Sequence, residues 1–261
     1  ANLSTLKNKV TSLGIGKDSY ISGAYATYVG QEIGQFYGWV YEGIARTQAD
    51  LDNHATQQGV NVGDCLYKDI SGPEGTPDGV IDAYDQTVLG SGLPKVNFGL
   101  STHMEYKGFD LNISTYGVLN YHVSDDIYNS LNSCYGYGNK EVGMLDANRW
   151  SEDGTYLSSV PRTYAANNAT LAWNDLFCSR KIQNAAYWKI ANVELGYNFP
   201  DKWFGGYVSG VRLYVSAQNL YTFTGYHGYN VDYAGGTFTP GYNFCSFPSA
   251  RTFMAGLHFT F

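Results

Sequence analysis

The segment Ala250–Phe261 reads ARTFMAGLHFTF and decides the fold class. Counted back from the last residue, every second side chain is apolar: Phe261, Phe259, Leu257, Ala255 and Phe253. A period of two with one apolar face predicts a β-strand. We expect no later segment to cover this face, and an uncovered apolar strand is an aggregation hazard in a water-soluble protein. In an outer-membrane barrel, such a strand is the closing strand of the wall.

The composition agrees with a barrel and argues against a nucleic-acid partner. Aromatic residues make up 16% of the chain, with 24 Tyr, and there are 31 Gly, whereas charged residues make up 15%. Such chains suit a barrel with aromatic girdles and tight turns. The net charge is -7 and the pI is about 5.1, so no basic stripe is present to neutralise phosphates.

The hydropathy does not exclude a membrane. The mean hydropathy is -0.28, and barrel strands average out as mildly polar because they alternate lipid-facing and lumen-facing residues. No apolar run reaches about 18 residues, so we expect no transmembrane helix. Polar residues occur throughout residues 1–10, which show no signal peptide. We therefore expect either a soluble chain or one that starts partway through a longer protein.

Four further segments alternate in the same way and form two pairs: Lys95–Lys107, Phe109–Tyr121, Tyr187–Phe199 and Gly210–Asn219. Within each pair the connection is short, which predicts hairpins, whereas long irregular segments separate the pairs. Short turns on one side and long loops on the other are typical of outer-membrane barrels. With a strand near the N-terminus we expect about six strands, fewer than the roughly eight that a single-chain barrel needs. The sequence thus predicts the C-terminal part of a larger antiparallel transmembrane β-barrel.

Several motifs occur in the order known from one protein family: Gly34–Ile44 (GQFYGWVYEGI), Asp78–Gly90 (DGVIDAYDQTVLG), Val96–Leu100 (VNFGL), Tyr106–Leu111 (YKGFDL), Asn192–Tyr197 (NVELGY), Leu213–Leu220 (LYVSAQNL) and Pro248–Phe261. Together they resemble the C-terminal region of SusC-like TonB-dependent outer-membrane transporters. The family's plug domain, TonB box and most barrel strands are absent. Because these barrels have about 22 strands, the resemblance implies that all of residues 1–261 belong to the barrel part and supply about its last six strands.

The resemblance implies transport and no enzymatic activity. Such a transporter imports glycans or peptides across the outer membrane of Gram-negative bacteria, is opened by the TonB complex through its plug, and is capped by a SusD-like lipoprotein. The extracellular loops that face this cap would be residues 14–94, 123–182 and 222–248. The polar strand positions that contact the plug or line the path would be Asn112, Asn192, Glu194, Arg212 and Gln218.

Residues 69–85 (DISGPEGTPDGVIDAYD) contain the best local motif. Its carboxylates match the second half of an EF-hand-like loop, which predicts Ca²⁺ as a cofactor held by Asp69, Asp78, Asp82 and Asp85. The first half is interrupted, and Asp85 stands where a bidentate Glu is usual. The alternative is a turn and a helix cap in which the carboxylates bind backbone N–H groups.

The four cysteines fall in the predicted loops. Without a CxxC spacing, zinc is not expected, and an even count in an exported protein predicts disulfides. We expect Cys134 to pair with Cys178, since both lie between the same two strands, which leaves Cys65 for Cys245. The alternative is four free thiols.

Aromatic residues gather in two settings. Those in the loops either stack on sugar rings or, more commonly, pack the loops and a partner interface: Tyr135, Tyr137, Trp150, Trp173, Tyr226, Tyr229, Tyr233 and Tyr242. A second group near a short turn predicts a membrane-interface girdle: Trp188, Tyr197, Phe199 and Trp203.

Catalytic patterns are weak in this sequence. The acid pairs Asp125-Asp126 and Glu152-Asp153 resemble glycosidase carboxylates, but adjacent loop acids point apart and more often cap helices. Asp18 follows Gly16-Lys17 where a P-loop has Ser or Thr. The competing interpretation of the whole chain is a secreted β-sandwich that binds carbohydrate and buries its apolar face by itself.

Overall fold

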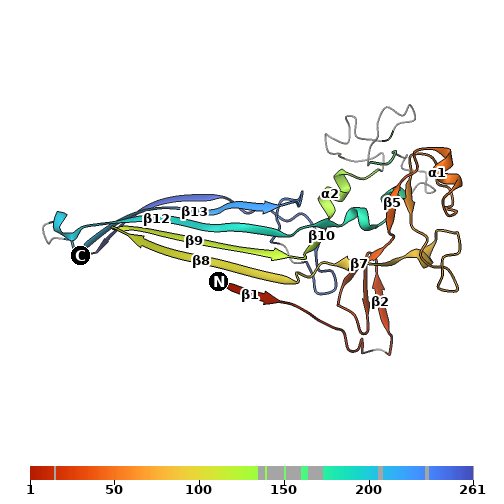
Figure 1. Cartoon of the computed structure of the whole chain (residues 1–261), viewed down its shortest axis with the longest axis horizontal. Coiled ribbons are helices and arrows are strands. Elements are labelled where there is room, and N and C mark those ends of the chain that lie inside the picture. The colour runs from red at the N-terminus through yellow and green to blue at the C-terminus, as the bar shows by residue number, and fades with distance from the viewer. Residues whose placement is uncertain are drawn as a thin grey trace.

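The computed structural model describes residues 1–14, 16–134, 139, 150, 160–163, 173–204, 208–232 and 235–260. Its strands fall into a long sheet on one side and a group of shorter sheets on the other (Figure 1). Residues 16–94, 160–163 and 173–182, which hold most of the shorter sheets, are called the loop region below. Within the described ranges, no helix is long and apolar enough to cross a bilayer.

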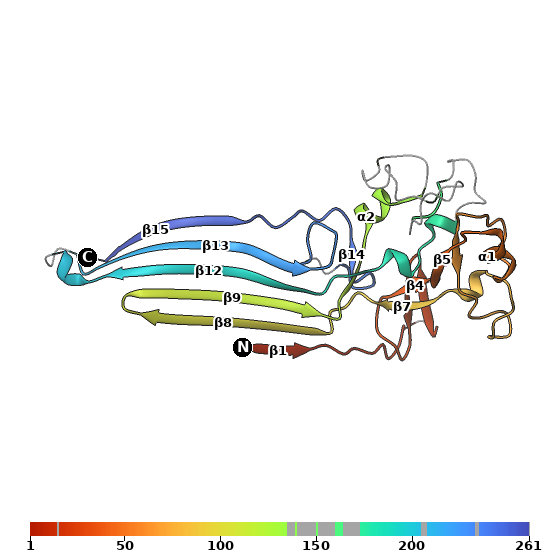
Figure 2. The same ribbon diagram turned by 45° about the horizontal axis from the view of Figure 1, so that its top comes forward.

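Six strands form the long sheet, which is antiparallel throughout, in the order β1-β8-β9-β12-β13-β15 (Figure 2). They are β1 Asn2–Thr5, β8 Val96–Tyr106, β9 Phe109–Leu119, β12 Tyr187–Phe199, β13 Gly210–Thr224 and β15 Thr252–Thr260. β12 has the predicted ends, whereas β13 continues past the predicted Asn219 to Thr224. β1 and β15 each pair with one strand, so each leaves an open edge among the described residues.

The β8–β9 connection is tight because two successive residues adopt positive φ. Lys107 has a φ of 48° and Gly108 a φ of 86°, values that fit a type I′ turn, whose twist matches that of the flanking strands. Glycine adopts this backbone without a steric penalty. The turn sets Tyr106 opposite Phe109 and thereby fixes the register of the hairpin.

The long sheet has one apolar and one polar face. Residues directly opposite each other in an antiparallel pair point to the same side, and Phe253, opposite Ala217, belongs to a row that is apolar from β15 to β9. This apolar face is open to solvent: Leu213 is 46% exposed, Leu100 52% and Phe253 68%. The next row on the opposite side is Ser101, Ser114, Asn192, Gln218 and Thr252. We call that side the polar face.

A bulge in β12 changes which residues reach the polar face. Asn192 pairs with Ser114 of β9, and Lys189 pairs with Tyr116, so β12 advances three residues where β9 advances two. Because the side-chain period of a strand is two, the extra residue in β12 inverts its alternation beyond the bulge. Lys189 therefore shares the polar face with Asn192, although strict alternation predicts the opposite side.

Aromatic clusters mark both ends of the apolar face. At the short-turn end, Phe109 and Tyr197 have ring centroids 4.6 Å apart, and Tyr197 and Phe199 4.9 Å. At the other end, Trp188 stacks on Phe223 at 5.3 Å. The sequence prediction that Trp188 lies near the short turn is wrong, because Trp188 is the second residue of β12 and belongs to the loop end.

The loop region contains regular sheets where the sequence predicted an irregular segment. One sheet has the order β2-β3-β4-β7, and β5 pairs with β6. The strands are β2 Ser19–Ser22, β3 Tyr25–Tyr28, β4 Gln35–Gly38, β5 Tyr41–Ile44, β6 Cys65–Tyr67 and β7 Thr87–Ser91. Their length of three to five residues shows too little alternation for a strand to be recognised from sequence. Phe36 and Tyr67 are completely buried, so this region has its own core.

The remaining elements of the described chain are short. They are helices α1 Gln48–Asp52 and α2 Asp126–Leu131, the 3-10 turns η1 Ala83–Asp85, η3 Ser179–Lys181 and η4 Asp201–Trp203, and strands β10 His122–Asp125, β11 Gln183–Asn184 and β14 Tyr242–Asn243. Of these, η4 lies at the short-turn end between β12 and β13. Asp125 caps α2 by accepting a hydrogen bond from the Tyr128 N–H. Its other carboxylate oxygen accepts from the Tyr226 hydroxyl and from Asn243 Nδ2. This buried network ties three distant loop segments together.

Candidate functional site

An ion-pair cluster occupies the polar face near the short turns. Arg212 donates from Nε to Asp110 Oδ1 at 3.0 Å, and from Nη2 to Asp110 Oδ2 at 2.5 Å and to Glu194 Oε1 at 2.7 Å. Asn198 Nδ2 adds a hydrogen bond to Asp110 at 3.0 Å. Gly196 provides the room, since a Cβ there would lie 2.5 Å from both Arg212 and Asp110. The cluster is well satisfied, which favours a fixed binding surface over a reactive site.

The remaining predicted lumen residues share this face. Asn112 contacts His103 Nδ1 at 2.6 Å through Oδ1, and His103 Nε2 lies 2.9 Å from Glu105. Asn192 stands opposite Gln218 in the β12–β13 pair. The structure therefore brings together the five residues predicted from sequence: Asn112, Asn192, Glu194, Arg212 and Gln218.

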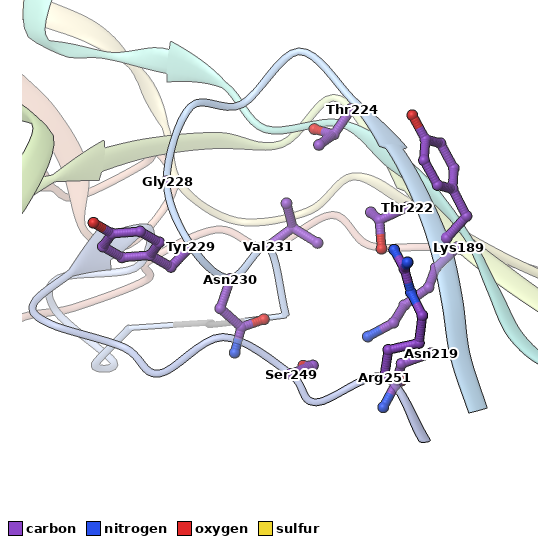
Figure 3. A pocket seen from close by; sticks show the side chains of 11 residues that line it. Lys189, Asn219, Thr222, Thr224, Gly228, Tyr229, Asn230, Val231, Ser249 and Arg251 are labelled. Carbon is purple, nitrogen blue, oxygen red and sulfur yellow. The ribbon is translucent and has the colours of Figure 1, made fainter. Parts of the chain in front are cut away.

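A pocket of about 330 Å³ lies at the loop end of the polar face. We call it the loop pocket, and β12, β13, the turn after β13 and the segment before β15 form it. Figure 3 shows Lys189 and Arg251 on the strand side and Asn230 and Tyr229 on the loop opposite. Its lining consists of Lys189, Asn219, Tyr221, Thr222, Thr224, Gly228, Tyr229, Asn230, Val231, Ser249 and Arg251.

One wall of the pocket is a loop, and Asp232 connects this loop to the strands of the long sheet. Its Oδ2 accepts a hydrogen bond from Lys189 Nζ at 2.6 Å, and its Oδ1 accepts one from the Tyr116 hydroxyl at 3.3 Å. Lys189 is only 3% exposed, so its charge is screened by little water. Tyr116 also lines a second hollow of about 750 Å³ beside β1, β8 and β9. Asp232 thus binds one residue from each of the two hollows.

The calcium-type segment uses its carboxylates within the chain. Asp85 is buried and accepts hydrogen bonds from the N–H groups of Ile70, Ser71 and Asp82. Asp82 accepts from the Tyr84 N–H. These contacts cap the 3-10 turn η1, which is the alternative given by the sequence.

The other two carboxylates behave in the same way. Asp78 accepts from the Val80 N–H, and Asp69 from the Gly79 N–H, while the second oxygen of Asp69 is buried without a hydrogen-bond partner. Among the residues that the structure describes, no group of three or more His, Cys, Asp or Glu is arranged to hold a metal ion. The contacts of these carboxylates form a cap, and the calcium site is not tested by them and stays a prediction.

All four cysteines are free thiols, and neither predicted pair is bonded. Cys65, Cys134 and Cys178 are completely or almost completely buried, whereas Cys245 is exposed. Cys65 and Cys178 share a hydrophobic cluster with Tyr67 in the loop region. Burial raises the pKa of the Cys134 thiol to about 11 and raises that of Cys65 further.

The loop aromatics that the structure describes mostly pack the loops. Trp173 contacts Trp39 and Tyr67 and donates from Nε1 to the Gln58 carbonyl. Tyr226 is buried in the Asp125 network, whereas Tyr229 is 64% exposed at the loop pocket. Trp150 lies over Gly63, and Tyr242 stacks on Phe244. Tyr135, Tyr137, Tyr233 and the acid pair Glu152-Asp153 lie outside the described residues.

Sequence reasoning missed the residues that shape the loop pocket. The bulge places Lys189 on the polar face, and no local sequence pattern predicts this bulge. Asp232 and Arg251 lie in loops, and only the tertiary fold shows that Asp232 reaches the strands. Asp110 was recognisable in principle, because it is an acid inside an alternating strand on the same face as Asn112.

Comparison with known proteins agrees with these features. No family model matches the chain. TonB-dependent receptor P3 of Formosa agariphila is 30% identical over 278 residues, which cover 100% of this chain and 26% of that protein. TonB-dependent receptor P26 of the same organism is 27% identical, covering 99% and 26%. TonB-dependent receptor SusC of Bacteroides thetaiotaomicron is 27% identical over 186 residues, covering 70% and 17%.

Solved structures share the fold. The RagAB peptide transporter superposes with a TM-score of 0.74 at 21% identity, over 97% of this chain and 25% of that chain. The open-open state of the RagAB peptide importer gives a TM-score of 0.71. The chain spans about a quarter of the length of the first curated relatives it matches. These relatives are named as receptors, and none of the names describes an enzyme. The family resemblance drawn from the motifs is thereby confirmed: the chain is homologous, over its whole length, to a segment of the TonB-dependent receptors that include SusC.

Proposed function

We propose that the chain forms part of the wall and the outer loops of a TonB-dependent importer in the outer membrane of a Gram-negative bacterium. The observation that carries this proposal is the exposed apolar face of the long sheet, which lies between two aromatic clusters and opposite a charged face. Soluble proteins rarely expose a continuous apolar surface of this kind. In a barrel wall, lipid covers it, and the aromatic clusters lie at the two interfaces.

The open edges of β1 and β15 support a place within a larger barrel. Unpaired backbone groups at a sheet edge are not tolerated in the hydrocarbon core, so both edges require neighbouring strands. We propose that the six strands of the long sheet are the last six of a barrel of about 22 strands. The strand that completes β15 would then be the first strand of the same barrel.

The loops and the polar face are placed where the other parts of such an importer, the lipoprotein cap and the plug, would contact them. The loop region extends from the end of the sheet opposite the short turns, where a SusD-like lipoprotein would cap the barrel (Figure 1). The cluster around Arg212 would contact the plug, through which the TonB complex acts. The structural neighbours are described as a peptide transporter or importer, which supports peptides as cargo, and glycans are the other cargo that the motif resemblance implies.

No observation favours the secreted β-sandwich. A sandwich buries its apolar face against a second sheet about 10 Å away. In the described part of the chain, Leu100, Leu213 and Phe253 on that face are 46% to 68% exposed. The shorter sheets lie beyond the end of the long sheet and do not stack on it (Figures 1 and 2).

Two substitutions at adjacent residues test which face meets lipid. Leu100 and Ser101 occupy the middle of β8 and point to opposite faces. In the full-length receptor, Leu100→Arg is expected to cost about 2 to 4 kcal/mol and to reduce assembly in the outer membrane, because it places a charge in lipid. Ser101→Arg faces the lumen and is expected to assemble normally. Heat-modifiable migration of detergent-extracted protein on a gel measures the assembled fraction.

The opposite results would reject the proposal. Equal assembly of Leu100→Arg, Ser101→Arg and the wild type would mean that Leu100 does not face lipid. A detergent-free, monomeric 28.8 kDa protein with cooperative unfolding would also be incompatible with a barrel wall.

A further inference from the structure

The loop pocket is cationic although the chain is acidic overall. The net charge of the chain is -7, yet among the described residues that line the pocket, Lys189 and Arg251 are the only ionisable acids or bases besides tyrosine. Asp232, outside the lining, neutralises Lys189. Arg251 forms no ion pair with any residue that the structure describes. The pocket therefore keeps one positive charge available to a ligand.

The groups around these cations fit a polar organic anion. Thr222, Asn230 and Ser249 bring hydroxyl and amide groups to the pocket, and exposed Tyr229 stands at its side (Figure 3). A guanidinium matches the planar, two-oxygen geometry of a carboxylate. The volume of about 330 Å³ lies at the small end of ligand pockets, which suits one residue-sized group.

Resting on the proposed function, we propose that the loop pocket binds a carboxylate group of the transported ligand through Arg251 and Lys189, in competition with Asp232. A uronic acid and an acidic amino acid both present this chemistry. The proposal concerns the carboxylate itself, and the probes below distinguish its two sources.

Asp232 acts as the competitor because it holds the same ammonium group. Two carboxylates close to one Lys189 repel each other, so a bound ligand weakens the contact between Asp232 and Lys189. Asp232 also binds Tyr116, which lines the second hollow on the polar face. A ligand that weakens the contacts of Asp232 therefore makes its loop more mobile, and this loop lies between the loop pocket and the second hollow.

Calorimetric titration of the full-length receptor in detergent tests the proposal with two matched pairs of probes. Glucuronate is compared with glucose, and acetyl-Ala-Glu-Ala-amide with acetyl-Ala-Gln-Ala-amide. The wild type should prefer the acid of at least one pair, and that pair identifies the source. Arg251→Gln should weaken binding of the preferred acid by about 10-fold to 100-fold, as expected for a lost charged hydrogen bond, and leave the neutral probe unchanged.

Asp232→Asn should act in the opposite direction. It removes the internal competitor and should strengthen binding of the preferred acid by roughly 3-fold to 10-fold. Tyr116→Phe is the matched control for loosening the loop, because it removes one contact of Asp232 without freeing Lys189. The increase in affinity for the preferred acid should be smaller in Tyr116→Phe than in Asp232→Asn. Lys202→Gln removes a cation at the other end of the sheet and should change nothing.

Three results would overturn the inference: no acid preference in the wild type, unchanged acid binding by Arg251→Gln, or weaker acid binding by Asp232→Asn. Heat-modifiability of the same samples separates this outcome from failure of the proposed function. A heat-modifiable receptor without acid preference overturns only the carboxylate site. A receptor that prefers the acid but is not heat-modifiable overturns only the barrel.

Discussion

The long sheet and the loop region bury their apolar side chains in different places. The loop region packs Phe36 and Tyr67 into a core of its own, where both are completely buried. The long sheet leaves Tyr106 and Phe253 largely exposed on one face. The first region therefore has the means to be stable by itself, whereas the second depends on what covers it. In an importer, this division places the self-supporting part in water and the dependent part in lipid.

The largest expected effect is the difference in labelling rate between the exposed and the buried cysteines, which shows whether the core of the loop region is closed. Cys65, Cys134 and Cys178 are buried, and burial raises the pKa of Cys134 from 9.0 to about 11. Near neutral pH, two pKa units make the reactive thiolate of Cys134 about a hundredfold scarcer. In the native receptor we expect iodoacetamide to modify Cys245 rapidly and the other three only after unfolding.

Mass spectrometry of labelled peptides checks this expectation. Disulfides between the predicted pairs would instead leave all four cysteines unlabelled after denaturation without a reductant. Rapid labelling of Cys65 would show that the loop region lacks the closed core described above.

The second-largest expected effect contrasts an ion pair of the loop region with an ion pair of the long sheet. Asp64 is 1% exposed and accepts from Arg162 Nε at 2.6 Å, Arg162 Nη2 at 2.9 Å and Asn174 Nδ2 at 2.8 Å. Asp64→Ala leaves these donors without their acceptor and should destabilise the loop region by about 3 to 5 kcal/mol. Arg212→Met on the polar face should cost the long sheet less, about 1 to 3 kcal/mol, because water reaches that cluster.

Hydrogen exchange measured by mass spectrometry resolves the two regions in each variant. Faster exchange confined to the loop region in Asp64→Ala, and to the long sheet in Arg212→Met, is the expected result. Faster exchange of both regions in Asp64→Ala would mean that they unfold as one unit.

The smallest expected effect concerns His122, where β9 leads into the loops. Burial lowers the pKa of His122 from its ordinary value of 6.5. The unfolded chain therefore binds the proton more readily than the folded one, so the contribution of His122 is complete above pH 6.5 and is lost as the pH falls through the folded pKa. We expect a small loss of stability on acidification.

Hydrogen exchange of the segment around β10 at several pH values tests this prediction. His122→Gln should remove the extra acid sensitivity while leaving the exchange at neutral pH nearly unchanged. An identical pH dependence in the wild type and the variant would assign the sensitivity to other groups.

Alternation was sufficient to predict the long sheet but not the loop region. β12 begins at Tyr187 and ends at Phe199 as expected, because a strand with one apolar face carries its period in its sequence. The strands of the loop region are too short for that signal. The parallel pairing of Ser124 with Tyr242 depends on tertiary contacts across more than a hundred residues, so no local pattern reveals it.

The residues of the candidate site were also predictable only where they lie in regularly alternating strands. The residues around Arg212 were predictable, because Glu194 and Asn112 are polar positions in alternating strands. The loop pocket was not, since Lys189 reaches it through a bulge and Asp232 through the course of a loop. Sequence periodicity describes faces of regular strands, whereas the pocket arises where that regularity is interrupted.

The bulge in β12 also makes the two faces of the sheet depend on the length of this strand. Removing the one extra residue near Ile190 would return the alternation to a strict period and exchange the two faces beyond that point. Lys189 would then turn toward the lipid side and Trp188 toward the interior, although neither residue had mutated. A single-residue deletion here would thus disturb more contacts than most substitutions, so the structure depends on the length of β12 as well as on its composition.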